Sequence, residues 1–209
     1  MANIIIECTK YLMIILITVY TYQCFTVFAY EDRKEKRKIL RNQNTLMFLI
    51  HFMAFASMYL KTGEVKILLF YIVQALILLV TLFLYTRIYP KASRLIVNNM
   101  CMLLTIGFIM ITRLQYNKAV KQSIIVAGAV ALSLIVPVIV RKVKGLSELR
   151  ILYAGIGIVA LAAVVVIGRV SGGAKLGFEI AGFGIQPSEF VKLLFVFYVA
   201  ASLNRSIEF

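Results

Sequence analysis

The chain has 209 residues, of which 62% are hydrophobic and only 15% are charged, whereas an ordinary soluble domain is roughly 45–50% apolar. A single soluble domain of this length cannot bury so much apolar surface, so the composition excludes a soluble globular protein and predicts a lipid environment. The net charge of +14 would suit a nucleic-acid-binding protein. In a membrane protein, however, excess Lys and Arg mainly mark cytoplasmic loops, so no nucleic-acid partner is expected.

A membrane-spanning helix needs about 20 mostly apolar residues. Seven stretches of that order follow one another, and the first six contain no Asp, Glu, Lys or Arg. The seventh is shorter and contains Glu189 and Lys192. The sequence therefore predicts an all-α fold, a polytopic integral membrane bundle with about seven transmembrane helices. In chain order the stretches are Tyr11–Tyr30, Asn42–Leu60, Ile67–Tyr85, Leu95–Thr112, Gln122–Val140, Ile151–Gly168 and Pro187–Leu203.

The N-terminal region predicts a retained first span. Glu7 and Lys10 precede an uncharged run that has no basic front region and no small-residue cleavage site behind it, unlike a removed signal peptide. The three cysteines, Cys8, Cys24 and Cys101, are odd in number and lack metal-ligand spacing. Neither a disulfide framework nor a metal site is therefore expected.

Alternate loops differ in their Lys and Arg content, which sets the orientation of a membrane protein. One set, made of residues 31–41, 87–94 and 141–150 with the C-terminal end, holds 14 of these residues, and the other set holds 8. We expect the richer set on the cytoplasmic side, with the N-terminus outside, the C-terminus inside and the segment Arg169–Gln186 on the outer face. The run Glu31–Arg41 is interpreted as a topology anchor and is assigned no function.

Isolated polar residues inside the stretches are interpreted as contacts between helices. For His51, a hydrogen bond to a neighbouring helix or a place near the membrane interface is favoured over proton transfer. Gln74, Asn98 and Asn99 are side chains of the kind that hold membrane helices together, and no function is assigned to them. Pro90 lies in a polar stretch between the third and fourth spans and is the best candidate boundary between two parts of the chain.

The composition changes abruptly after Gly168. Five glycines lie between Gly172 and Gly184, so the backbone can turn tightly or approach a ligand closely. Apolar residues alternate with others in this segment, which fits either a short hairpin or an interfacial loop at the membrane edge.

The next residues, Gln186–Glu189, favour a helix start, because proline suits the first helical position and glutamate favours the positive end of the helix dipole. A cap alone would explain Glu189. Lys192, three residues later, lies on the same helix face and can pair with it. An ionisable pair near lipid is expected to face a protein interior or a wet cavity, and Lys175 would add a second positive charge. We therefore predict a site for an anionic, phosphate-bearing ligand.

Three motifs together, Gly173–Lys175, Gln186–Glu189 and Lys192, resemble the SEDS family, whose members include FtsW, RodA and SpoVE. In that family these motifs flank the outer end of the fourth of ten spans, whereas here they flank the seventh. The resemblance covers residues 95–209 and implies the first four spans of a SEDS-type polymerase domain, truncated. Residues 1–94 would then be an extra N-terminal segment of three membrane helices.

The resemblance implies a peptidoglycan glycosyltransferase that polymerises lipid II on the outer face of the bacterial cytoplasmic membrane. Its expected partner is a class B penicillin-binding protein, and the process served is cell division, elongation or sporulation. Leu176 and Gly177 stand where the family usually has arginine and tryptophan, which weakens the case for substrate contacts in that loop. The substrate-binding positions implied are Lys175, Gln186, Pro187, Ser188, Glu189 and Lys192.

The family's catalytic aspartate lies in a later outer loop, beyond Phe209, so no catalytic residue is expected here. We expect a fragment or truncated homologue that does not polymerise glycan alone. No cofactor or metal is implied for this chain, and a divalent cation is left open for the full-length enzyme. Two alternatives remain: a flippase or transporter of a lipid-linked precursor, and a non-catalytic membrane scaffold for a penicillin-binding protein.

Overall fold

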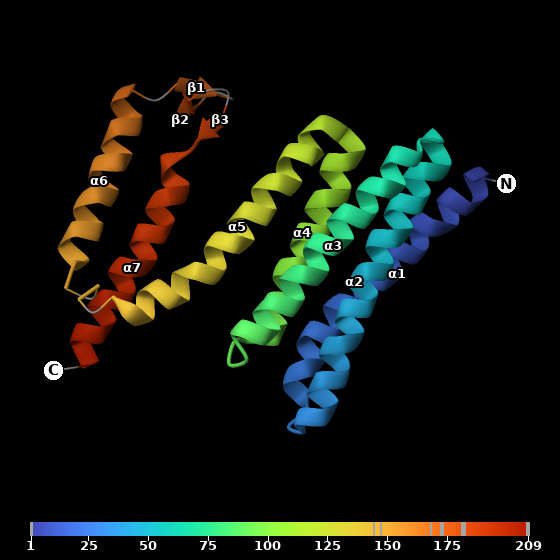
Figure 1. Ribbon diagram of the computed structural model, residues 1–209, viewed down its shortest axis with the longest axis horizontal. Helices are drawn as coiled ribbons and strands as arrows, with labels where there is room; N and C mark the ends of the chain where they lie inside the picture. Colours follow the sequence, from blue (N-terminus) through green and yellow to red (C-terminus); the bar gives the residue numbers. More distant parts are fainter. Residues whose placement is uncertain are drawn as a thin grey trace. The chain divides into compact units, whose positions relative to one another are not determined.

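The computed structural model describes residues 2–143, 145–146, 148–167, 169–171, 174–180 and 183–207. For residues 2, 141, 167, 169–171, 174–180, 183–185 and 204–207 it describes the backbone alone. These ranges contain seven helices and three short strands (Figure 1). In order they are α1 (Ala2–Ala29), α2 (Arg33–Thr62), α3 (Val65–Ile88), α4 (Arg94–Leu114), α5 (Tyr116–Lys142), α6 (Arg150–Ile167), β1 (Arg169–Ser171), β2 (Ala174–Ile180), β3 (Phe183–Ile185) and α7 (Pro187–Ile207).

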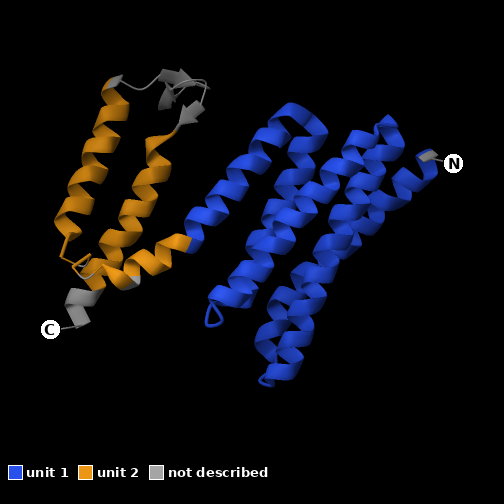
Figure 2. Cartoon of the chain, viewed as in Figure 1, with its two compact units in different colours: residues 1–134 blue, residues 135–209 orange. Residues whose placement is uncertain are grey.

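The chain divides into two compact units, residues 1–134 and residues 135–209, which Figure 2 colours separately. Unit 1 contains α1 to α4 and most of α5, and unit 2 contains the last turns of α5, the strands, α6 and α7. The predicted domain boundary after residue 94 was based on the family resemblance and not on compactness. It lies inside unit 1. The division into residues 1–94 and 95–209 stays a prediction.

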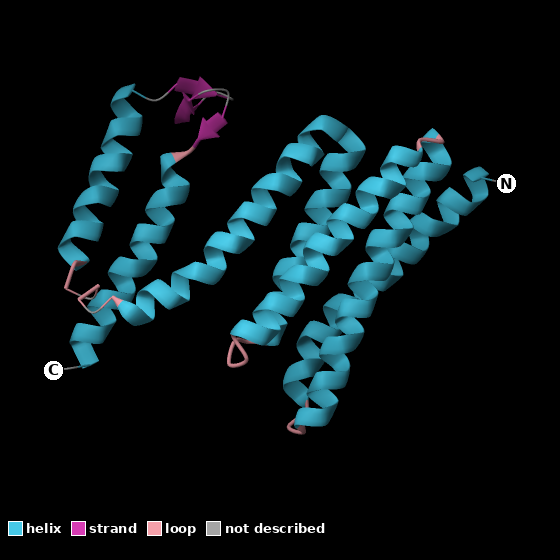
Figure 3. Ribbon diagram, in the orientation of Figure 1, coloured by secondary structure: helices cyan, strands magenta, loops and turns pink. Residues whose placement is uncertain are grey.

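Each of the seven predicted stretches coincides with a helix, apart from Tyr30, which follows α1, and Gly168, which lies outside the described residues. The all-α prediction was nevertheless incomplete. The strands form a three-stranded antiparallel sheet in the order β1-β2-β3 (Figure 3). In its register Ser171 lies opposite Ala174, and Phe178 lies opposite Ile185. The alternation of apolar residues in this segment is the period-two pattern of a strand, so the hairpin alternative is the one that the chain adopts.

The bounds of α2 follow from its end residues. Asp32 is extended, and its carboxylate accepts a hydrogen bond from the backbone N–H of Lys34 at 3.0 Å, which caps the first turn. At the other end Gly63 adopts a left-handed conformation, with φ 70°, and its N–H donates to the carbonyl of Tyr59 at 2.8 Å. The charged run that precedes the second apolar stretch is therefore helical from Arg33 onward.

Replacing Gly63 by alanine is expected to lower the free energy of unfolding by about 1 kcal/mol, because an alanine with positive φ is strained although the added Cβ meets nothing within 4 Å. Gly107, inside α4, also has open space around it but has ordinary helical backbone. Its replacement by alanine should leave stability unchanged or raise it. Thermal unfolding of both variants in detergent, followed by circular dichroism, tests the contrast, and equal losses would contradict it.

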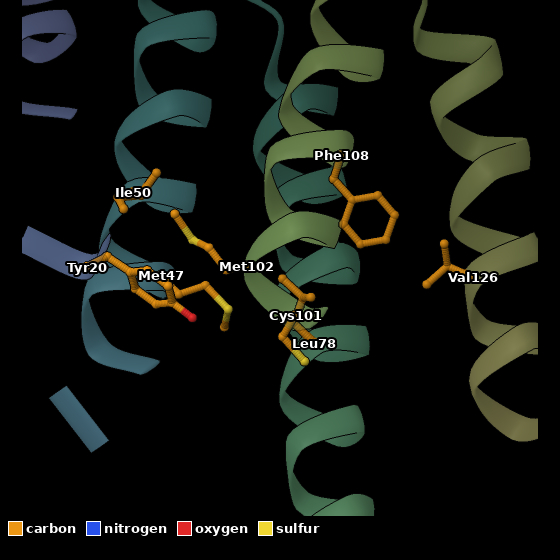
Figure 4. Close-up of a cluster of buried hydrophobic side chains, with 8 residues drawn as sticks. All are labelled: Tyr20, Met47, Ile50, Leu78, Cys101, Met102, Phe108 and Val126. Carbon is orange, nitrogen blue, oxygen red and sulfur yellow. The ribbon is translucent and has the colours of Figure 1, made fainter. Parts of the chain in front are cut away.

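Unit 1 has a hydrophobic core to which all five of its helices contribute (Figure 4). Phe108 of α4, Met47 and Ile50 of α2 and Leu78 of α3 are at most 1% exposed. The remaining buried members are Tyr20, Cys101, Met102 and Val126. A second cluster, Phe55, Ile67, Phe70 and Ala119, continues this core. Helix α4 packs against both α2 and α3.

Many large apolar side chains are nevertheless exposed, such as Phe83 and Ile96 at 63% and 70%. Among the described residues, α1 to α5 are long and apolar enough to cross a membrane, and at most 33% of the most apolar stretch of each is buried. Lipid is the solvent that suits the rest. The structure thus supports a multi-pass membrane protein. Helix α6 is shorter than these five, so the count of seven spans and the orientation remain predictions.

Unit 2 is built around a pair of helices. Helices α6 and α7 pack against each other, and the backbone of β2 lies against both. The rings of Tyr153 and Phe197 lie 5.8 Å apart between the two helices. A Cβ added to Gly157 would lie 3.6 Å from Val191, so this glycine sits in the helix contact. The sheet leads directly into α7 through Gln186.

Candidate functional site

The predicted site begins where the sheet ends and α7 starts. Pro187 occupies the first helical position, where its missing N–H costs no hydrogen bond. Glu189 lies in the first turn, and its backbone N–H donates to the carbonyl of Gln186 at 3.0 Å. The carboxylate thus stands near the positive end of the helix dipole. The predicted helix start at Gln186–Glu189 is confirmed.

The predicted pairing of Glu189 with Lys192 is also confirmed. The Lys192 ammonium donates to Glu189 Oε1 at 2.7 Å, across one turn of α7. Both side chains are well exposed, at 62% for Glu189 and 69% for Lys192. An exposed pair of this kind contributes at most about 1 kcal/mol to stability. Stability alone therefore does not explain two ionisable groups at the start of an apolar helix.

The other predicted site residues lie near this pair to different degrees. Gln186 is exposed, and Pro187 and Ser188 are half-buried at the same helix start. The backbone of Lys175 lies in β2, opposite Val170, and β2 packs against α7. The side chain of Lys175 and the whole of Gly173 lie outside the described part of the structure. Where side chains are described, no three His, Cys, Asp or Glu residues are grouped as a metal site would require.

Buried polar side chains form a first network between α4, α2 and α1. Asn98 donates from its amide to Gln43 Oε1 at 3.1 Å and to the carbonyl of Leu40 at 2.9 Å. Asn99 accepts from the hydroxyl of Tyr20 at 3.1 Å and from the thiol of Cys24 at 3.2 Å. The prediction that these asparagines hold helices together is confirmed.

A second network is centred on Gln74 of α3. Its oxygen lies 3.3 Å from His51 Nε2 on α2, and its NH2 group donates to Thr112 on α4 and to Ser123 on α5. His51 is fully buried, and its ring lies 4.8 Å from Phe55 and 5.0 Å from Tyr71. The prediction that His51 bonds to a neighbouring helix is confirmed.

The sequence analysis missed a cavity that is lined largely by residues of the basic run 31–41, which it interpreted only as a topology anchor. The cavity measures about 550 Å³ and is lined mainly by cationic side chains from α2 and α4. A local signal for it exists, because Lys34, Arg37, Lys38 and Arg41 are spaced i, i+3, i+4 and i+7 and so share one helix face. The contribution of Arg94, more than 50 residues later, has no local signal.

Apolar helices with exposed apolar faces, joined by buried polar networks, define a multi-pass membrane protein. Residues 93–208 match the model of the FtsW/RodA/SpoVE family, described as cell cycle proteins. This match covers more than half of the chain, so the chain belongs to the FtsW/RodA/SpoVE family. The resemblance predicted for residues 95–209 is confirmed. Family membership associates the protein with peptidoglycan synthesis. No curated protein and no solved structure matches the chain.

Proposed function

We propose that this chain forms the precursor-binding part of a peptidoglycan glycosyltransferase that polymerises lipid II on the outer face of the bacterial cytoplasmic membrane. The family match over residues 93–208 supports the reaction class. The Lys and Arg bias of the loops supports the orientation, which places the start of α7 outside. A class B penicillin-binding protein is the partner that the family resemblance implies.

The observation that carries the proposal is the ion pair between Glu189 and Lys192. Lipid II presents a pyrophosphate close to the membrane surface, and an ammonium group is a suitable counter-charge for it. The carboxylate of Glu189, 2.7 Å away, holds that ammonium in one place on the exposed face of α7. Lys175, on the strand that packs against α7, would supply the second cation. In this role Lys192 binds the ligand and Glu189 positions Lys192.

Gln186, Pro187 and Ser188 complete the proposed site by fixing where α7 begins. Proline at the first helical position commits the backbone to helix, so the pair lies within one turn of the loop that carries the sheet. The exposed amide of Gln186 is available to hydrogen-bond a phosphate or sugar oxygen. The site residues that the family resemblance implies in this chain are binding positions, so the property to measure on this chain is binding.

Neutralising the pair, as E189Q/K192Q, is expected to weaken lipid II binding by at least about tenfold. One lost charge-assisted contact is worth about 1.5–3 kcal/mol, and about 1.4 kcal/mol is a factor of ten. Binding of fluorescent lipid II to the whole chain in detergent provides the measurement. The matched control is E64Q/K66Q, which neutralises the exposed pair at the start of α3, where Lys66 lies 3.0 Å from Glu64.

The single variants separate the two roles. Lys192→Gln should reproduce most of the loss, whereas Glu189→Gln keeps the ammonium and should lose only a few-fold. Unchanged binding in E189Q/K192Q, or an equal loss in E64Q/K66Q, would overturn the site. Transfer of lipid II across vesicles by the chain alone would favour a flippase. Co-purification with a penicillin-binding protein but without lipid II binding would favour a scaffold.

A further inference from the structure

An open cavity of about 550 Å³ is lined by the first turns of α2, the last turn of α3 and the start of α4. The α1–α2 connection and the α3–α4 turn, which adjoin these segments, lie at the same end of unit 1 (Figure 1). Its volume is within the roughly 300–1,000 Å³ typical of small-molecule sites. Three helices contribute to its wall, so it is a concave site and not a flat charged face. The lining residues are Lys34, Glu35, Arg37, Lys38, Leu40, Arg41, Asn44, Thr86 and Arg94.

The charge of this cavity is strongly positive. Five of the nine lining residues are Lys or Arg, and Glu35 is the one acidic member. Among the described residues the ion pairs are Lys10–Glu7, Lys66–Glu64 and Lys192–Glu189, so none of the five lining cations is paired there. Unpaired cations that converge on one concavity reinforce one another's field and attract an anion.

The shape of the cavity is fixed by contacts behind it. Asp32 caps α2, so the charged run is helical and four of its cations lie on one face. Leu40, which lines the cavity, accepts a hydrogen bond at its carbonyl from Asn98 at 2.9 Å. Asn98 lies one turn after Arg94 in α4, so this bond holds the helix of Arg94 against the helix of Arg41. The two guanidinium-bearing walls are thus held before any ligand arrives.

Polar neutral groups are also present. Thr86 donates its hydroxyl to the carbonyl of Leu82 at 2.7 Å, which fixes the side chain at the cavity wall. The side-chain oxygen of Asn44 is buried without a hydrogen-bond partner. The amide of Asn44, which lines the cavity, also carries an NH2 group that can donate. Such a donor beside several cations suits a phosphate, whose oxygens accept several hydrogen bonds at once.

Lipid-facing surface begins within a turn of the cavity. Phe83, one turn before Thr86 in α3, is 63% exposed, and Ile96, two residues after Arg94 in α4, is 70% exposed. A ligand with a phosphate headgroup and acyl chains could therefore place its headgroup among the cations and its chains along these helices. Basic pockets between membrane helices bind anionic headgroups in this way.

A topology anchor needs basic residues only near the end of a span, and it requires no cavity. Arg94 comes from a different helix and still lines the same concavity as Arg41. A second hollow of about 530 Å³ lies on the α1 side of α2, shares Glu35, Lys38 and Arg41, and has only two cations. The convergence of five cations distinguishes the first cavity.

We propose that the cavity lined by Lys34, Arg37, Lys38, Arg41 and Arg94 binds a phosphate-bearing anion, supplied either by the headgroup of an anionic membrane lipid or by free phosphate. The proposal is independent of the polymerase proposal, because no residue is shared between the two sites.

The test is binding to the whole chain purified in detergent, with three probes: dioctanoyl phosphatidylglycerol, dioctanoyl phosphatidylcholine and inorganic phosphate. Native mass spectrometry counts bound molecules, and a titration gives the affinity. The cavity variant is R41Q/R94Q, with K34Q/R37Q as a second variant on the same wall. The matched control is R33Q/K91Q, which removes the same charge at the same end of unit 1 from residues that do not line the cavity.

We expect phosphatidylglycerol to bind one site, about tenfold more weakly in either cavity variant and unchanged in R33Q/K91Q. Phosphatidylcholine should bind at least tenfold more weakly than phosphatidylglycerol, because it carries no net charge. Saturable binding of inorganic phosphate, lost in R41Q/R94Q, would support the site and identify a soluble source. Equal losses in the cavity and control variants would overturn the proposal, because they would show general charge attraction. Absence of binding by every probe would also overturn it.

Discussion

Replacing Asn98 by leucine is expected to lower the free energy of unfolding by about 2 kcal/mol. Leucine keeps the branching of asparagine at Cγ, although it is the larger side chain, and it removes the donor that serves Gln43 Oε1 and the carbonyl of Leu40. Asn98 is 3% exposed and Gln43 is fully buried, so no water replaces the donor. A buried acceptor left without a partner costs about 1–3 kcal/mol. The chain has no tryptophan, so unfolding in detergent is best followed by circular dichroism.

Two further variants test whether the loss comes from the hydrogen bonds of Asn98. Asn42→Leu removes an exposed asparagine from α2 and should change stability by less than about 0.5 kcal/mol. The double variant Q43M/N98L removes the orphaned acceptor together with its donor, and it should recover much of the loss. If N98L behaves like N42L, the hydrogen bonds of Asn98 do not stabilise the fold.

The contacts of Asn98 bear on how the two predicted parts of the chain are related. Residues 93–208 match the family, and Asn98 lies near the beginning of that match. Its partners Leu40 and Gln43, however, lie in α2, in the segment that precedes the match. The first family helix therefore packs on the N-terminal helices through buried polar groups. Such groups are costly to separate in lipid, so we expect the two parts to fold together.

Much of this arrangement could be predicted from the sequence, because membrane helices are long and uniform. Uncharged stretches of about 20 residues locate the helices directly. A polar side chain inside such a stretch must find a partner, which is why the interpretations of His51, Gln74 and Asn98 were confirmed. The spacing of Glu189 and Lys192 sets their contact by local helix geometry alone.

Features that depend on how separate segments pair or meet could not be predicted. The glycine-rich segment fitted both a hairpin and a loop, because the choice depends on which strands pair and in what register. The basic cavity depends on Arg94 meeting Arg41, which α3 and the α3–α4 turn bring about. A count of Lys and Arg in each loop gives their number, but it does not show which of them lie close together in the fold. It therefore predicted only a topology anchor in the run 31–41 and overlooked the cavity.

Replacing Gln74 by methionine is expected to lower the free energy of unfolding by about 1–2 kcal/mol. The reason is that the single amide group of Gln74, on α3, is hydrogen-bonded to residues of α2, α4 and α5. The largest loss of hydrogen bonding falls on His51. Its Nδ1 has no hydrogen-bond partner, and the variant removes the partner of Nε2 as well. Thr112 and Ser123 keep hydrogen bonds from their hydroxyls to the carbonyls of Phe108 and Ala119. The loss is therefore concentrated on one buried imidazole. Unfolding in detergent provides the measurement.

A double-mutant cycle with His51 shows whether the loss has this origin. Phenylalanine at position 51 keeps a ring beside Phe55 and Tyr71, so H51F alone mainly orphans the oxygen of Gln74. In H51F/Q74M neither polar partner remains, and the double variant should be more stable than the sum of the single losses predicts. The coupling should be about 0.6–1.7 kcal/mol, the range measured for hydrogen bonds between membrane helices. Additive losses would contradict a direct bond.

The same cycle separates a structural histidine from one that transfers protons. A structural role requires only that the pair be satisfied or be removed together, so H51F/Q74M should fold and bind lipid II as the unmodified chain does. A proton-transfer role requires a titratable ring at position 51, and no apolar replacement would restore it. His51 is fully buried, and its Nε2 faces the amide of Gln74, a group that does not itself titrate near neutral pH. That environment favours the structural role, and loss of lipid II binding in a stably folded H51F/Q74M would contradict it.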